Sequence, residues 1–249
     1  MRDHYWELPM KLQRHIPSLF TLINLFLGFL AILNVQQGNF NLACYFVLIA
    51  AFIDSMDGKL ARAFGISTNF GMEIDSLADM VSFCLAPSVM VYHLYTFGLP
   101  GISGELIAAA PMIFGAIRLA RFNVGQLETP KSIFIGLPTP VAALAISALV
   151  LFTVQERSIN PEYTQPRLIL PIVFLISFLM VSKIRYPKFP LLNFNSGMAN
   201  TIFILMLLSF LISFIAGLYF NFESRILMGF VALYIFYGLL KQFKQSETI

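Results

Sequence analysis

Residues 40–62 read FNLACYFVLIAAFIDSMDGKLAR, and this stretch decides the fold. Residues 40–53 are almost all apolar, as in a helix that crosses a bilayer, yet Asp54 and Asp57 follow within the same segment. A spanning helix needs roughly 20 predominantly apolar residues, and ionisable groups inside it are costly unless they line a polar site. The stretch therefore predicts a membrane-spanning helix that carries a polar site near one end.

The composition of the whole chain extends this prediction to the other segments. Of its 249 residues, 58% are hydrophobic and 12% are charged, and the mean hydropathy is +0.78. Soluble domains carry roughly 25% charged residues, and they rarely expose large apolar patches. The composition excludes a soluble protein. It indicates an integral membrane protein that has the lipid bilayer as its surroundings and no nucleic-acid partner.

Further apolar stretches are long enough to span the membrane, some by including polar residues. With the first, they cover about residues 17–35, 40–62, 71–96, 104–123, 136–154, 167–183, 200–220 and 225–241. The connections are short, and none is long enough to separate domains. We expect an all-α, polytopic bundle of about eight transmembrane helices that forms a single domain over residues 1–249.

The basic residues predict the orientation of this bundle. If the N-terminus is cytoplasmic, eight spans return the C-terminus to the cytoplasm. Thirteen Lys and Arg residues then fall on the cytoplasmic side and three on the other, namely Arg157, Arg167 and Arg225. This asymmetry follows the positive-inside rule, so both termini are expected in the cytoplasm.

Four aspartates lie at helical spacing on the second and third predicted spans. Asp54 and Asp57 are three residues apart, and Asp75 and Asp79 are four apart, so each pair shares a helix face. Counted from the connection at residues 63–70, both pairs lie roughly 6–14 Å deep at 1.5 Å per residue. Clustered carboxylates repel one another unless cations neutralise them. Hard oxygen ligands prefer Mg²⁺, Mn²⁺ or Ca²⁺ over zinc, so a divalent metal site is expected.

Small residues and one arginine accompany the aspartates. Gly58 and Ala61 follow Asp57, and Gly71 precedes Asp75 by one turn. Small side chains allow a ligand or a neighbouring helix to approach closely, and Arg62 could contact a phosphate. Packing alone would also explain small residues, and a single membrane aspartate could cap a helix or pair with an arginine. Four aspartates at paired spacing favour a metal site.

The spacing of these residues resembles the signature of the CDP-alcohol phosphatidyltransferases. The matching positions are Asp54, Asp57, Gly58, Ala61, Arg62, Gly71, Asp75 and Asp79. This family transfers a phosphatidyl group from a CDP-lipid to an alcohol and releases CMP. The resemblance assigns the catalytic helices to about residues 17–183, with additional helices at about 200–241.

The resemblance also implies roles for individual residues. Asp54, Asp57 and Asp75 would hold a pair of Mg²⁺ or Mn²⁺ ions that clamp the diphosphate. Asp79 would touch one metal and act as general base toward the acceptor hydroxyl. The CDP-lipid would be bound by Gly58, Ala61, Arg62 and Gly71. Two metal ions can stabilise the attacking and leaving oxygens of an in-line displacement.

Other segments resemble the serine-specific branch, the phosphatidylserine synthases (CDP-diacylglycerol–serine O-phosphatidyltransferases). They are residues 17–28, 118–123, 134–140 and 181–187. In the first of these, Ser18 replaces the usual Asn. L-Serine carries a carboxylate that needs a cationic partner, and an arginine can bind it through two hydrogen bonds. We expect Arg118 and Arg121 at the acceptor site, with Asn123 and Lys131 as further candidates, although positive-inside anchoring also predicts arginines there.

Several alternatives stay open from the sequence. The acceptor could be glycerol phosphate or inositol phosphate, and the donor could carry archaeal ether-linked chains. A cation carrier or channel is a remote alternative, because membrane carboxylates also mark ion pathways. We expect a homodimer in a prokaryotic inner membrane, with the active site facing the cytoplasm.

Overall fold

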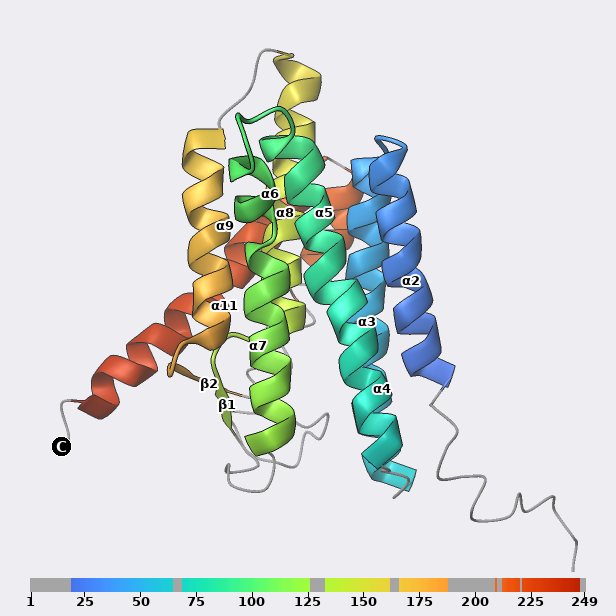
Figure 1. The fold of residues 1–249 in the computed structure, drawn as a ribbon, viewed down its shortest axis with the longest axis vertical. Helices are drawn as coiled ribbons and strands as arrows, with labels where there is room; N and C mark the ends of the chain where they lie inside the picture. The colour runs from blue at the N-terminus through green and yellow to red at the C-terminus, as the bar shows by residue number, and fades with distance from the viewer. Residues whose placement is uncertain are drawn as a thin grey trace, which may run out of the picture.

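The computed structural model describes residues 19–64, 69–125, 133–161, 166–187, 209, 212–219 and 221–246. These residues are mostly helical, as predicted for a polytopic membrane protein. The α-helices are α2 (Leu19–Gln36), α3 (Phe40–Phe64), α4 (Asn69–Asp79), α5 (Ala86–Val91), α6 (Ser103–Ala108), α7 (Ala110–Gly125), α8 (Thr139–Ile159), α9 (Pro166–Val181) and α11 (Glu223–Ser246). The long helices run roughly side by side, and α11 crosses them obliquely (Figure 1).

Five helical segments within the described ranges are long and apolar enough to cross a membrane. They are Leu19–Gln36, Phe70–Thr96, Ser103–Val124, Thr139–Ile159 and Glu223–Gln242. Two shorter apolar helices, Phe40–Met56 and Leu168–Val181, correspond to two further predicted spans. The predicted span at 200–220 lies mostly outside the described residues. The structure thus supports a polytopic membrane protein with five spans by length and composition.

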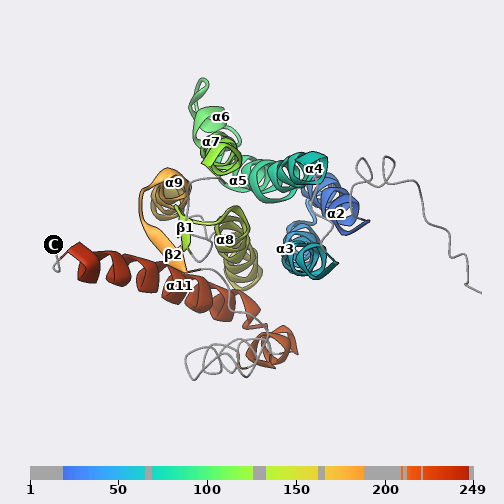
Figure 2. The same ribbon diagram turned by 90° about the horizontal axis from the view of Figure 1, so that it is seen from below.

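Helix α8 occupies the centre of the bundle. Two thirds of its apolar window, 67%, is buried inside the molecule, the largest share among the five spans. It contacts α3, α5, α7, α9 and α11, and Figure 2 shows it surrounded by its neighbours. Its buried small residues, such as Ala142, Ala145 and Ala148, allow these helices to pack closely.

The span Phe70–Thr96 contains two π-helical turns, η1 (Met80–Leu85) and η2 (Tyr92–Thr96), on either side of α5. The first begins directly after Asp79. Pro87 lacks an amide hydrogen and cannot complete an α-helical turn with the residues before it, and Ala86 N–H bonds to the Val81 carbonyl, five residues back. Such wide turns often occur at functional sites.

A small antiparallel sheet joins the connections at one end of the bundle. Strand β1 (Ile133–Ile135) pairs with β2 (Arg185–Pro187), so that Phe134 faces Tyr186 across the ladder. Gly136 follows β1 with a φ of 77°, and a Cβ there would collide with the Met180 carbonyl. The all-α prediction did not include this sheet, which links the start of α8 to the end of α9.

Candidate active site

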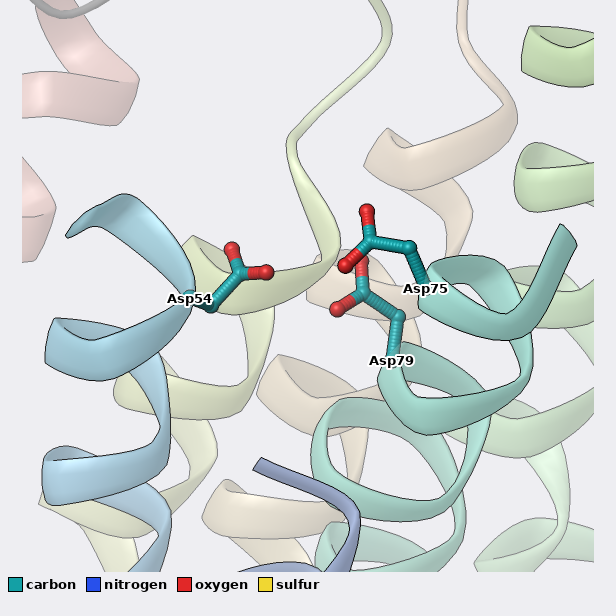
Figure 3. A group of neighbouring side chains, drawn as sticks. All are labelled: Asp54, Asp75 and Asp79. Carbon is teal, nitrogen blue, oxygen red and sulfur yellow. The ribbon is translucent and has the colours of Figure 1, made fainter. Parts of the chain in front are cut away.

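Asp54, Asp75 and Asp79 form an acidic cluster between α3 and α4. Each contributes one carboxylate oxygen, and these oxygens lie within 4.8 Å of one another. Figure 3 shows Asp54 pointing from α3 toward Asp75 and Asp79, which project from successive turns of α4. All three side chains are half-buried. The structure therefore brings three of the four predicted metal ligands to one place.

The geometry of the acidic cluster fits a divalent cation. Two unit charges 4.8 Å apart repel by about 3 kcal/mol at an effective dielectric constant of about 20. The cluster contains three such pairs, and a cation between them converts this repulsion into attraction. Carboxylate oxygens are the ligands that Mg²⁺, Mn²⁺ and Ca²⁺ prefer.

The remaining predicted residues of the motif are placed less completely. Asp57, Gly58, Ala61 and Arg62 lie in α3, but their side chains belong to the part that the structure does not describe. Gly71 lies in α4, one turn before Asp75, and is half-buried. Lys131 lies outside the described residues.

Arg118 reaches the acidic cluster from α7. Its side chain is 8% exposed, and its guanidinium interacts electrostatically with Asp79. Nη1 donates a hydrogen bond to Thr139 Oγ1 at 3.1 Å. Nε is buried and has no hydrogen-bond partner among the described residues. The hydrogen bond to Thr139 thus fixes the guanidinium near the acidic cluster, and Nε remains as a donor without a partner among the described residues.

Arg121 and Asn123 make contacts that connect helices. Arg121 Nη1 donates to the Val181 carbonyl at 3.1 Å, at the end of α9. Asn123 Nδ2 donates to Glu73 Oε2 at 3.3 Å, and Asn123 Oδ1 accepts from Ser76 Oγ at 3.1 Å. Both contacts of Asn123 join α7 to α4. Arg118 alone of these two predicted arginines is buried beside Asp79.

Two polar residues beside the cluster were not predicted as site residues. Asn24 on α2 is fully buried and donates from Nδ2 to Asp79 Oδ1 at 3.4 Å, and Thr139 begins α8 and holds Arg118. The signal for Asn24 is present in the sequence, because it is a polar residue within an otherwise apolar span. Thr139 lies within residues 134–140, a segment that resembles the serine-specific branch, but its hydrogen bond with Arg118 depends on how two helices pack and was not predicted.

Tyr186 on β2 and Tyr234 on α11 form an aromatic pair near Arg118. Their rings stack with centroids 5.7 Å apart, and Tyr234 interacts electrostatically with Arg118. Gly238 leaves room for the Tyr186 ring against α11. Burial raises the pKa of Tyr186 to about 12, so its phenol stays neutral. Through this pair of rings, α11 packs against β2.

The half-buried acidic cluster between α3 and α4 has the ligands and the spacing to hold a metal ion, in a chain with several helices long and apolar enough to cross a membrane. The chain belongs to the CDP-alcohol phosphatidyltransferase family, whose sequence model matches residues 14–236. The resemblance noted in the sequence is therefore confirmed.

Relatives within this family have related activities. The chain is 36% identical over 90% of both sequences to the CDP-diacylglycerol–serine O-phosphatidyltransferase of Helicobacter pylori strain 26695. It is 35% identical to the enzyme of the same name from Bacillus subtilis strain 168, over 70% of this chain and 91% of the relative. It is also 35% identical to the archaetidylserine synthase of Methanothermobacter thermautotrophicus, over 70% of each sequence.

Proposed function

We propose that this protein transfers a phosphatidyl group from CDP-diacylglycerol to the hydroxyl of L-serine and releases CMP. The observation that carries the proposal is the convergence of Asp54, Asp75 and Asp79 in a chain that resembles serine phosphatidyltransferases over 90% of its length. The membrane spans suit this reaction, because one substrate is a lipid and the other is soluble.

The acidic cluster is the proposed catalytic centre. Asp54, Asp57 and Asp75 would hold a pair of Mg²⁺ or Mn²⁺ ions, with Asp79 completing the set. When bound, the ions supply positive charge that stabilises the attacking and leaving oxygens. Asp79 takes the proton of the serine hydroxyl. The serine oxygen forms a bond to the lipid-proximal phosphorus, and the bond from that phosphorus to the CMP oxygen breaks with its electron pair on CMP.

The substrates are assigned to the two sides of this centre. Gly58, Ala61 and Gly71 leave room for the cytidine nucleotide, and Arg62 contacts phosphate. The serine carboxylate binds Arg118, whose Nε is buried without a partner among the described residues. An unpaired buried donor is costly, and a carboxylate would satisfy it. Arg121, Asn123 and Lys131 remain further candidates for the acceptor site.

The test is CMP release by the purified protein with CDP-diacylglycerol and Mg²⁺ or Mn²⁺. We expect release to depend on L-serine and to yield phosphatidylserine. Glycerol phosphate and inositol phosphate serve as competing acceptors, and an ether-linked CDP-lipid as a competing donor. A phospholipid product formed only with one of these acceptors would overturn the serine assignment. Ion flux in proteoliposomes without any lipid product would instead support a carrier.

The proposal includes a membrane arrangement. A single domain over residues 1–249 spans a prokaryotic inner membrane eight times, with both termini and the active site on the cytoplasmic side. In support, Arg118 and Arg121 lie in the last turns of α7, and Lys183 follows the end of α9, at the end of the bundle that carries β1 and β2 (Figure 1). Accessibility of introduced cysteines to a membrane-impermeant reagent tests this orientation.

We also propose a homodimer, as is common in this family. Chemical cross-linking in the native membrane tests it, with a doubled mass as the expected result.

A further inference from the structure

Asn24 is held in one orientation beside Asp79. Its side chain is 0% exposed, and Ser82 Oγ donates to its backbone carbonyl at 2.7 Å. One turn later, Gly28 packs so closely on η1 that an added Cβ would lie 2.7 Å from the Ser82 Cα. Helix α2 is therefore fixed against η1 at this level, and the carboxamide of Asn24 cannot move far from Asp79.

The two ends of this carboxamide have different surroundings. Nδ2 donates to Asp79 Oδ1 at 3.4 Å. An ionised carboxylate only accepts hydrogen bonds, so the amide nitrogen must face it and Oδ1 must point elsewhere. Oδ1 is buried and has no hydrogen-bond partner among the residues that the structure describes. Buried acceptors are normally paired, so Oδ1 is suited to a donor that arrives with a ligand.

Asn24 and Arg118 approach Asp79 from different helices. The helix that runs from α4 into α5 lies between α2 and α7 (Figure 2), and η1 contacts both. Asn24 comes from α2 and Arg118 from α7, and within the described part of the chain the acceptor Oδ1 of Asn24 and the donor Nε of Arg118 have no hydrogen-bond partner. A ligand at Asp79 would thus meet a hydrogen-bond acceptor from one helix and a cationic donor from the other.

We propose that Asn24 Oδ1 accepts a hydrogen bond from the ammonium group of the serine acceptor and so helps to select serine over other alcohols. The ammonium group is on the carbon next to the one that bears the hydroxyl. A side chain that touches the base for the hydroxyl proton is therefore within reach of the ammonium. Arg118 binds the carboxylate on the same carbon. This inference rests on the assignment of Asp79 as base in the proposed function.

Three contacts around one chiral carbon have a consequence for stereochemistry. If the hydroxyl lies at Asp79, the ammonium at Asn24 and the carboxylate at Arg118, the D-enantiomer can make only two of the three contacts in the same position. Glycerol phosphate and inositol phosphate have no ammonium to donate. Asn24 would thus discriminate among acceptors through a contact that these two alcohols lack.

The test compares Asn24→Leu with Asn34→Leu in the full-length protein at saturating Mn²⁺. Leucine removes both polar atoms at similar size. Asn34 is on the same helix, about 15 Å further along, and its amide bonds to the Leu30 carbonyl at 2.8 Å. We expect Asn24→Leu to raise the KM for serine about 10- to 100-fold, as for a lost hydrogen bond to a charged group. The KM for CDP-diacylglycerol should stay within about two-fold, and Asn34→Leu should change neither.

A serine analogue isolates the ammonium contact. 3-Hydroxypropionate lacks the ammonium group but keeps the hydroxyl and the carboxylate. Its inhibition constant against serine should be the same in Asn24→Leu and in the wild type. An equal loss of affinity for serine and for 3-hydroxypropionate would overturn the proposal, as would a larger effect on the KM for CDP-diacylglycerol.

Asn24→Asp separates the two ends of the side chain. It keeps an acceptor oxygen for the ammonium but replaces the donor to Asp79 with a second carboxylate oxygen. The KM for serine should stay near the wild-type value while kcat falls. A serine KM that rises as far as in Asn24→Leu would refute the contact. Full activity of Asp79→Asn would show that Asp79 is not the general base. The KM values for serine in the Asn24 variants would still show whether Asn24 contacts the ammonium group.

Discussion

The substitution Asp54→Asn should stabilise the metal-free protein while it removes activity. Asp54 contributes an oxygen within 4.8 Å of oxygens of Asp75 and Asp79. Each pair of charges at this distance costs about 3 kcal/mol at an effective dielectric constant of about 20. Replacing one carboxylate by a neutral amide of the same shape removes two of the three repulsive pairs. Because the side chains are half-buried, solvent screening reduces the gain to a few kcal/mol at most.

The assay is thermal unfolding in detergent, with EDTA or with Mn²⁺. For a chain of this size, about 1 kcal/mol shifts the Tm by roughly 2–4 °C, so Asp54→Asn should melt several degrees above the wild type in EDTA. Wild-type protein should gain stability when Mn²⁺ is added, by about 2.7 kcal/mol at 100 times the Kd. The variant should lose most of this gain. CMP release should fall in parallel, since the site no longer holds the metal.

A matched control neutralises an acid away from the cluster. Glu105 on α6 is exposed and accepts a hydrogen bond from Tyr92 Oη at 3.5 Å, so Glu105→Gln should leave the Tm and the response to Mn²⁺ unchanged. A Tm of Asp54→Asn in EDTA below that of the wild type would refute the repulsion argument. An undiminished response to Mn²⁺ would refute the role of Asp54 in holding metal.

Three further predictions concern the base, the acceptor site and the turn after β1. Asp79→Asn should lower kcat about 10²- to 10⁴-fold, as expected for loss of a general base, while CDP-lipid still binds in a metal-dependent manner; retained turnover would exclude this role. Arg118→Leu should raise the KM for serine about 10- to 100-fold and that for CDP-diacylglycerol much less, whereas an equal rise would place the arginine at the phosphates. Gly136→Ala should destabilise the protein by about 1–2 kcal/mol or more, because an added Cβ is strained at positive φ and meets the Met180 carbonyl. Thermal unfolding checks this against Gly98→Ala, which shares the positive φ of 86° but has open space around it; equal shifts in Tm would show that the contact contributes nothing.

The membrane helices and the faces of the aspartates could be predicted because both depend on local properties of the chain. Apolar length predicts a span whatever its neighbours are, and a spacing of three or four residues puts side chains on one helix face. The positions of Asp75 and Asp79 on successive turns of α4 follow from this alone. The π-helical turn after Asp79 did not follow, although Pro87 indicates a disturbance of regular α-helical hydrogen bonding nearby.

Contacts between distant segments could not be predicted in the same way. Strands β1 and β2 contain three residues each, which is too short for an alternating pattern to be visible. Arg121 and Asn123 were predicted from a motif, but their hydrogen bonds to Val181 and Glu73 became visible only when α7, α9 and α4 were placed together.

By itself, the sequence determined that this chain is a membrane protein with four carboxylates near one end of two neighbouring helices. The hydropathy and the helical period that establish this are properties of short segments. Only the tertiary structure decided which polar groups surround Asp79, because α2, α3, α4 and α7 must first pack together. The arrangement of Asn24 and Arg118 around the base depends on side chains 94 positions apart in the sequence, and no local pattern encodes such a distance.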